Sequence, residues 1–150
     1  MNRFLIVIVI WGTLFEQLFG NENVTSIPIY EFHNKKKTDY FYSITNNPPK
    51  KYIKSSIPFY AFNIKDNNID LSEVLTPIFL FQKKKLHYLS TDKNNKPDGF
   101  KLIGVAFYAL NTELDGAMPV YQYKSKNKKG GYKFTFNSNP SEDFIAVESN

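Results

Sequence analysis

Residues 77–81 read Pro-Ile-Phe-Leu-Phe, and residues 86–90, beyond a lysine-rich turn, read Leu-His-Tyr-Leu-Ser. Both stretches are rich in aromatic and branched apolar residues and are bounded by turn residues, a pattern typical of short β-strands. Proline is tolerated at the first residue of a strand, because that residue need not donate a ladder hydrogen bond. These residues therefore predict two consecutive strands joined by a turn.

The same motifs recur on both sides of this stretch. The proline motif appears 49 residues earlier and 42 residues later, and the second motif follows it each time. A third motif, Phe-Tyr-Ala followed by Phe or Leu and then Asn, is present twice, 48 residues apart. The proline motif occupies 28–32, 77–81 and 119–123, the second motif 39–43, 86–90 and 131–135, and the third 59–63 and 107–111. This constant order predicts three repeats, at about 27–74, 75–116 and 117–150.

The repeats predict an all-β fold, since no stretch after residue 20 shows a helical period sustained over three turns. Three repeats of roughly 40 residues, each with about four short strands, match a β-trefoil-like barrel, whose closure leaves few free edges. An elongated solenoid of hairpins is the alternative. The third repeat is shortened because it lacks the third motif. Either residues 145–148 close the barrel, or the closure differs from the standard one.

The motifs resemble a repeat family of uncharacterised secreted domains, whose units read roughly P-V-Y-R-F, then D-H-F-Y-T, then G-I-A-F-Y-V. The second repeat is the most similar, with His87–Thr91 and Gly104–Tyr108 at the second and third motifs. The first repeat has Asp39 but carries Tyr40 in place of histidine, and the third departs most. The resemblance implies a β-trefoil lectin-like module, of a kind often found beside secreted hydrolases, and it implies glycan binding.

Residues 1–20 have the form of a secretory signal peptide. A basic start at Arg3 precedes an apolar run of about 12 residues, shorter than the roughly 20 residues of a membrane span. A signal anchor is the alternative. Cleavage near Gly20 leaves 21–150 as a single domain, in which Asn23 begins an N-glycosylation sequon. The sequence therefore predicts a secreted, extracellular protein.

Composition excludes several classes of protein and site. The 150 residues include 17% aromatic and 42% hydrophobic residues and no cysteine, and the net charge is +5. The aromatic content excludes a disordered tail, and the lack of cysteine excludes disulfides, thiol chemistry and cysteine-held metals. There are two histidines and no catalytic motif such as G-x-S-x-G or H-E-x-x-H. We therefore expect no metal, no cofactor and no enzymatic activity.

Lysine runs at 35–37, 83–85 and 124–129 fall between the first and second motifs of each repeat. Such runs attract anionic polysaccharides and other polyanions through long-range electrostatics. They also occur simply as soluble turns, which is the interpretation that the sequence alone favours. Secretion argues against nucleic acid as a partner, and no amphipathic helix is predicted that would insert into a membrane.

The expected function is non-catalytic binding of a carbohydrate or a glycoprotein. An outward-facing tyrosine beside Asp or Asn suits a sugar, because the ring packs on the apolar sugar face and the polar group bonds hydroxyls. The predicted ligand-binding residues are Asp39, Tyr42, Asn63, His87 and Asn111. The alternative is a secreted protein-interaction module, an effector or an inhibitor, that binds an extracellular protein through loops at 67–73 or 93–99.

Overall fold

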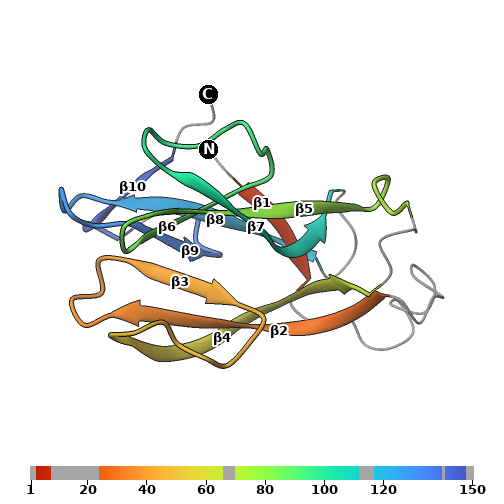
Figure 1. The fold of residues 1–150 in the computed structure, drawn as a ribbon, viewed down its shortest axis with the longest axis horizontal. Helices are drawn as coiled ribbons and strands as arrows, with labels where there is room; N and C mark the ends of the chain where they lie inside the picture. The colour runs from red at the N-terminus through yellow and green to blue at the C-terminus, as the bar shows by residue number, and fades with distance from the viewer. Residues whose placement is uncertain (1–2, 8–23, 66–69, 112–116, 140, 148–150) are drawn as a thin grey trace.

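The computed structural model describes residues 3–7, 24–65, 70–111, 117–139 and 141–147. These residues form ten β-strands and no helix, which confirms the predicted all-β class (Figure 1). The strands are β1 (Arg3–Val7), β2 (Val24–Asn34), β3 (Tyr40–Ser43), β4 (Tyr52–Ile64), β5 (Leu75–Lys83), β6 (Leu86–Ser90), β7 (Lys101–Leu110), β8 (Ala117–Ser125), β9 (Tyr132–Thr135) and β10 (Phe144–Ala146).

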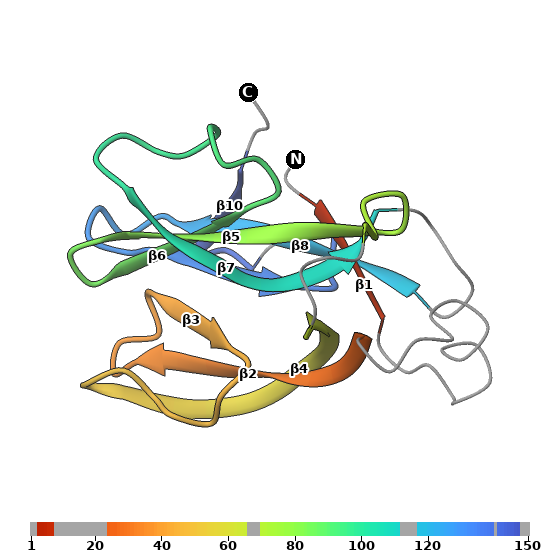
Figure 2. The same cartoon turned by 45° about the vertical axis from the view of Figure 1, so that its right-hand side comes forward.

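Strands β2, β5 and β8 are each the centre of an antiparallel strand group. β2 lies between β3 and β4 in the first group, and β5 lies between β6 and β7 in the second. In the third group β8 pairs with β9, β10 and β1. Pairing of β7 with β4 and with β1 joins the groups into one hydrogen-bonded network. The first group forms one layer, below the other two groups in both views (Figures 1 and 2).

The first two groups contain three strands each, where the sequence predicted about four. Residues 52–64 and 101–110 run as continuous strands rather than as two short ones. Register shifts occur instead between Ile29 and Phe32 in β2 and between Ile78 and Phe81 in β5. Such irregularities bend a strand and increase its twist, so each group curls around its buried face without a break in the chain.

The proline motif has the same register in all three groups. Each proline pairs with the second residue of a four-residue apolar stretch on the neighbouring strand. The residue after each proline then lies opposite a phenylalanine. The three pairs are Pro28 with Tyr60, Pro77 with Tyr108 and Pro119 with Leu5.

The core lies where the three groups meet. The residues that directly follow the prolines, Ile29, Ile78 and Val120, are at most 1% exposed. Burial of an aliphatic or aromatic side chain contributes roughly 1.5–3 kcal/mol, so each side chain of this shared core stabilises the fold. The main cluster consists of Ile29, Tyr40, Tyr42, Phe59, Ala61, Ile78, Leu89, Phe107, Ala109, Val120 and Phe134.

Buried polar contacts also join the groups. The Tyr42 hydroxyl of the first group accepts a hydrogen bond from the Phe134 amide of the third group at 2.8 Å and donates one to Glu31 at 2.9 Å. The Gln122 side chain of the third group bonds both the amide and the carbonyl of Leu89 in the second, each at 3.2 Å. Because an unmade hydrogen bond in a core is costly, these contacts favour one relative placement of the groups.

Replacing Ile78 with alanine is expected to lower the free energy of unfolding by about 3 kcal/mol, because the site is fully buried and leaves a cavity among three groups. The matched control is Ile53→Ala, whose side chain is 54% exposed and whose loss is expected to change stability by less than about 0.5 kcal/mol. Urea unfolding followed by circular dichroism measures both. Equal effects of the two substitutions would contradict the placement of the core.

Candidate functional site

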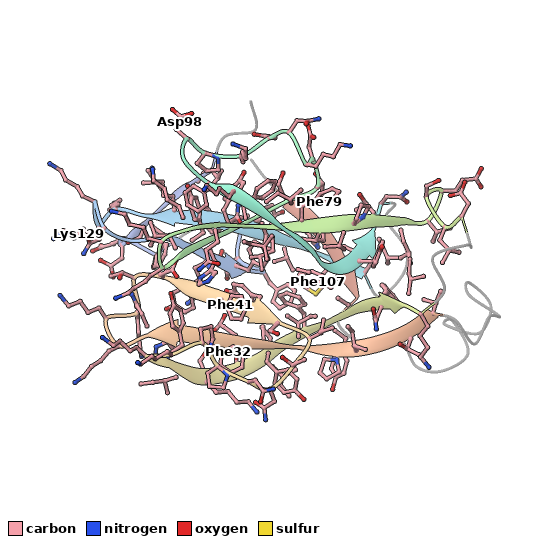
Figure 3. All side chains as sticks on the ribbon, viewed as in Figure 1. Phe32, Phe41, Phe79, Asp98, Phe107 and Lys129 are labelled. Atoms are coloured by element: carbon pink, nitrogen blue, oxygen red, sulfur yellow. The ribbon has the colours of Figure 1, made fainter. Side chains whose placement is uncertain are left out.

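One end of the strand groups carries the lysine-rich turns. The turns after β2, β5 and β8 and the segment before β4 come together there, and the label of Lys129 marks this end in Figure 3. Lys37, Lys51 and Lys84 have positive φ values of 52°, 73° and 55°, a left-handed conformation that is uncommon outside glycine and asparagine. Tight turns thus bring together lysines that are far apart in the sequence.

Two adjoining pockets at this end form what we call the lysine groove. The first has a volume of about 300 Å³ and the second of about 350 Å³. They share Lys50, Lys51, Tyr52 and Lys85, so the half-buried Tyr52 ring lies between them. The remaining lysines of the groove are Lys35, Lys36, Lys84 and Lys129.

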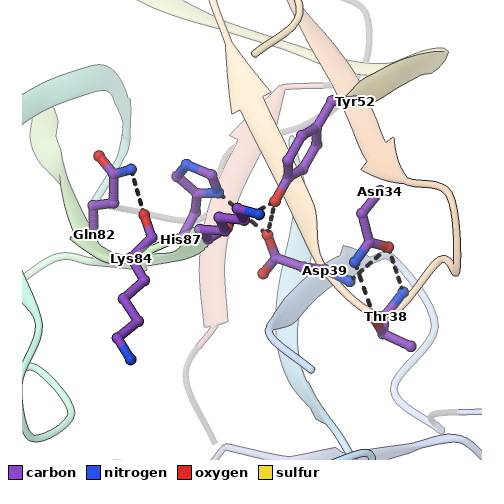
Figure 4. Close-up of polar contacts among 8 residues, drawn as sticks. Asn34, Thr38, Asp39, Tyr52, Gln82, Lys84 and His87 are labelled. Carbon is purple, nitrogen blue, oxygen red and sulfur yellow. Dashed lines mark hydrogen bonds and ion pairs between the residues drawn. The ribbon is translucent and has the colours of Figure 1, made fainter. Parts of the chain in front are cut away.

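The floor of the groove is a polar cluster of buried Asp39, buried His87 and half-buried Tyr52. Asp39 Oδ2 accepts a hydrogen bond from the Tyr52 hydroxyl and lies 3.2 Å from His87 Nδ1 (Figure 4). The Tyr52 hydroxyl is also 2.8 Å from the carbonyl oxygen of Lys85. Asp39 and His87 are 1% and 8% exposed. The cluster therefore connects the first and second groups directly beneath the lysines.

The β2–β3 turn holds Asp39 in place. Asn34 Oδ1 accepts hydrogen bonds from the amides of Thr38 at 2.9 Å and of Asp39 at 3.4 Å. The Gly131 amide, in the third group, donates to the Thr38 carbonyl at 2.6 Å. Gly131 packs so closely on Asp39 that a Cβ atom there would lie 2.6 Å from Asp39 Cγ. Glycine is required at this position by the close approach of the two segments.

The lysines give the groove its charge. Asp39 is the one carboxylate that lines the groove among the described residues, and it is buried and bonded to Tyr52. Burial, followed by the hydrogen bond and the charge of Asp39, raises the pKa of Tyr52 far above its ordinary value. No groove lysine has an ion-pair partner among the described residues. The groove is therefore strongly electropositive.

Three lysines outside the groove, Lys54, Lys83 and Lys133, contact other protein groups. Lys83 Nζ donates to the Asp98 carbonyl at 2.8 Å. Lys54 Nζ lies 4.8 Å from the centre of the Tyr30 ring. The groove lysines have no comparable contacts in the described part of the chain, which leaves their charges available to a ligand.

The cavity inside the described part of the molecule is too small for a sugar. A small cavity of about 10 Å³ lies among the side chains of Tyr40, Tyr42, His87, Gln122 and Tyr132. This volume is about that of a single water molecule, whereas small-molecule sites measure roughly 300–1,000 Å³. The groove on the surface is thus a better candidate for a ligand site than this cavity.

The structure brings together two of the residues predicted to bind a ligand, Asp39 and His87, in the floor of the groove. Tyr42 is 4% exposed and belongs to the core. Asn63 lies in β4 and Asn111 follows β7, both at the opposite end of the strands from the groove, and Asn111 Nδ2 donates to the Ser72 carbonyl at 2.7 Å.

Sequence reasoning missed Lys50, Lys51 and Tyr52, which lie between the repeated motifs. The signal for them was the run Pro-Pro-Lys-Lys-Tyr at 48–52, in which two prolines fix the chain just ahead of two lysines and a tyrosine. The predicted glycosylation site Asn23 lies outside the described residues, as does most of the predicted signal peptide.

Comparisons with known proteins supply no relative from which a function can be transferred, because the chain matches no protein-family model, no curated protein and no solved structure. In the part of the chain that the structure describes, no group of three His, Asp or Glu side chains could hold a metal ion. The same residues include no helix with the length and apolar character needed to cross a membrane.

Gly131→Ala is expected to destabilise the protein by roughly 1–3 kcal/mol, because the added methyl group overlaps the Asp39 carboxylate. The penalty should shrink when Asp39 is also alanine, since that change removes the carboxylate the methyl group meets. Thermal unfolding of the wild type, both single variants and the double variant measures this coupling. Strictly additive changes in stability would show that residues 131 and 39 are not in steric contact.

Stability is expected to fall between pH 10 and pH 12. Burial, with smaller contributions from Tyr88 and Asp39, raises the pKa of Tyr132 from 10.0 to about 12. The raised pKa means that the folded state favours the neutral Tyr132 side chain. The resulting contribution to the free energy of unfolding is complete below pH 10 and is lost as the pH rises through 12. Urea unfolding across this range should show that the free energy of unfolding declines less in Tyr132→Phe than in the wild type, by up to roughly 2 kcal/mol. An unchanged decline in that variant would contradict the burial of Tyr132.

Proposed function

We propose that the protein is a secreted, non-catalytic carbohydrate-binding module with a β-trefoil-like architecture of three repeats, and that it binds anionic glycans in the lysine groove. The observation that carries the proposal is the convergence of lysines from four separate segments on one groove. Like charges held close together repel one another, and a bound polyanion removes that cost.

The shape of the groove supports a chain-like ligand rather than a single sugar. Its two parts adjoin at Tyr52 and Lys85, so a linear glycan can lie across both. Sulfate and carboxylate groups on such a chain accept hydrogen bonds from lysine Nζ atoms. The Tyr52 ring between the two parts offers an apolar face on which a sugar ring can pack.

The rigidity of the groove floor favours binding. The Asp39, Tyr52 and His87 cluster connects strands of two groups, and Gly131 packs against it from the third. Lysines on short turns above such a floor lose less conformational freedom on binding than lysines on long loops, and preorganisation of this kind increases affinity.

The repeated register supports the trefoil-like part of the proposal. Prolines stand at the same pairing position in all three groups, and register shifts fall within the proline motif in β2 and in β5. The resemblance of the same motifs to lectin-like repeats is in keeping with a carbohydrate ligand.

The test is binding of the folded protein to sulfated and neutral oligosaccharides of equal length. We expect saturable binding to the sulfated chain that weakens steeply as salt is added, because charge contacts release counterions. Lys50→Ala/Lys51→Ala should weaken it by about 10-fold, corresponding to about 1.4 kcal/mol. The matched control is Lys93→Ala/Lys96→Ala, which removes two exposed lysines outside the groove and should leave the affinity unchanged within about twofold.

Two results would contradict the proposal. Equal losses in the two double variants would mean that net charge, rather than the groove, attracts the glycan. No binding to any glycan, together with saturable binding of an extracellular protein that competing sugars do not affect, would favour the protein-interaction module instead.

A further inference from the structure

The third strand group lacks the Phe-Tyr-Ala motif, and in the structure β1 lies in its place (Figure 2). In the first two groups, the second residue of this motif pairs with the proline of the central strand. In the third group, Leu5 of β1 pairs with Pro119. The equivalent pairs are Tyr60 with Pro28 and Tyr108 with Pro77.

A second, independent register gives the same alignment. β4 contacts β7 through the pair Phe62 and Tyr108, and β7 contacts β1 through the pair Leu110 and Leu5. Phe62 and Leu110 are both the fourth residue of the motif, so Tyr108 and Leu5 occupy equivalent positions. Phe4, opposite Val120, then stands where Phe59 and Phe107 stand in the other groups.

The rest of the third group does not cover this part of β8. Tyr121 pairs with both Arg3 and Thr135, and Tyr123 pairs with both Lys133 and Ala146. Since a strand has two edges, β1 and β10 share the edge opposite β9. β10 reaches only Tyr123–Ser125, so among the described strands β1 alone pairs with this edge along 117–120.

We propose that the edge of β8 from Ala117 to Tyr121 is a strand-acceptor site. Arg3–Val7 occupies it in the full chain, and an extended apolar segment of a partner polypeptide occupies it after residues 1–20 are removed as the predicted signal peptide. Without an occupant, the edge presents unpaired backbone groups next to Val120 of the main core, and both features favour the addition of a strand. The inference rests on the three-group arrangement and not on glycan binding, because the lysine groove lies at the other end of the strands.

The equivalent strands define the sequence that the site accepts. The first, third and fourth residues of the Phe-Tyr-Ala motif are buried in both β4 and β7, each with no more than 2% of its surface exposed. The matching positions in β1 are Phe4, Ile6 and Val7 by register. The partner segment is therefore an extended strand that pairs antiparallel to β8. Its four consecutive residues are an aromatic residue, any residue and two apolar residues.

The test uses the full chain, produced without secretion and with a specific protease site in place of residues 14–19. After folding, the chain is cut, and a fluorescent peptide of residues 2–9 is added. We expect the released N-terminal fragment to remain bound during gel filtration and the labelled peptide to replace it saturably. A Phe4→Asp peptide should bind at least about 10-fold more weakly, because it places a charge opposite Val120. The matched control peptide, Arg3→Gln, changes the end of the strand and should bind like the original.

A measurement on the uncut chain does not depend on the cut product staying folded. Phe4→Asp should speed hydrogen exchange of the backbone amides at 117, 118, 120 and 121, Pro119 having none, and leave those of β5 unchanged. The proposal is overturned if the released N-terminal fragment separates from the cut chain without any change in the melting temperature of that chain. It is equally overturned if the Phe4→Asp peptide and the original peptide bind with the same affinity. It is also overturned if the cut chain unfolds and added peptide does not restore it. None of these readouts involves a glycan, so failure here is separate from failure of the groove to bind one.

Discussion

The register of the proline motif is the constraint on which the rest of the structure depends. Side chains alternate between the two faces of a strand, so a slip of one residue would move Ile29, Ile78 or Val120 from the core to the surface. A central proline also lacks an N–H group, which restricts the pairings in which it can stand. A lysine of each turn follows the proline by seven residues, at Lys35, Lys84 and Lys126. The same register that fills the core thus brings the basic turns to one end.

The groove is formed by packing between groups rather than by any one of them. Asp39 belongs to the first group and His87 to the second, and Gly131 of the third group closes on Asp39 from the other side. The buried Asp39 carboxylate is only half satisfied among the described residues, because the tyrosine hydroxyl and the imidazole lie against Oδ2 whereas Oδ1 has no hydrogen-bond partner. The site therefore depends on the fold remaining intact as a whole, although its lysines lie on exposed turns.

How much the sequence predicts depends on the kind of interaction. Alternation of apolar residues and the recurring motifs predicted the all-β class and the recurring strand positions, because burial is encoded locally in the strand. The contact between Asp39 and His87 joins residues 48 positions apart, and no local pattern encodes a contact between groups. Of the three consecutive aromatics at 40–42, Tyr40 and Tyr42 are buried and Phe41 is half-buried. Sequence alone could not assign their orientation, which is why Tyr42 was predicted to face a ligand.

The pairing of β1 with β8 has a consequence for the order in which the molecule can fold. In the full chain Arg3 pairs with Tyr121, so residues 3–7 can close the strand network only when nearly the whole chain is available. The first two groups can form from neighbouring segments, whereas the last closure brings together distant residues and bears a larger loop-closure entropy. In the full chain, the edge of β8 is therefore expected to be the last edge covered during folding.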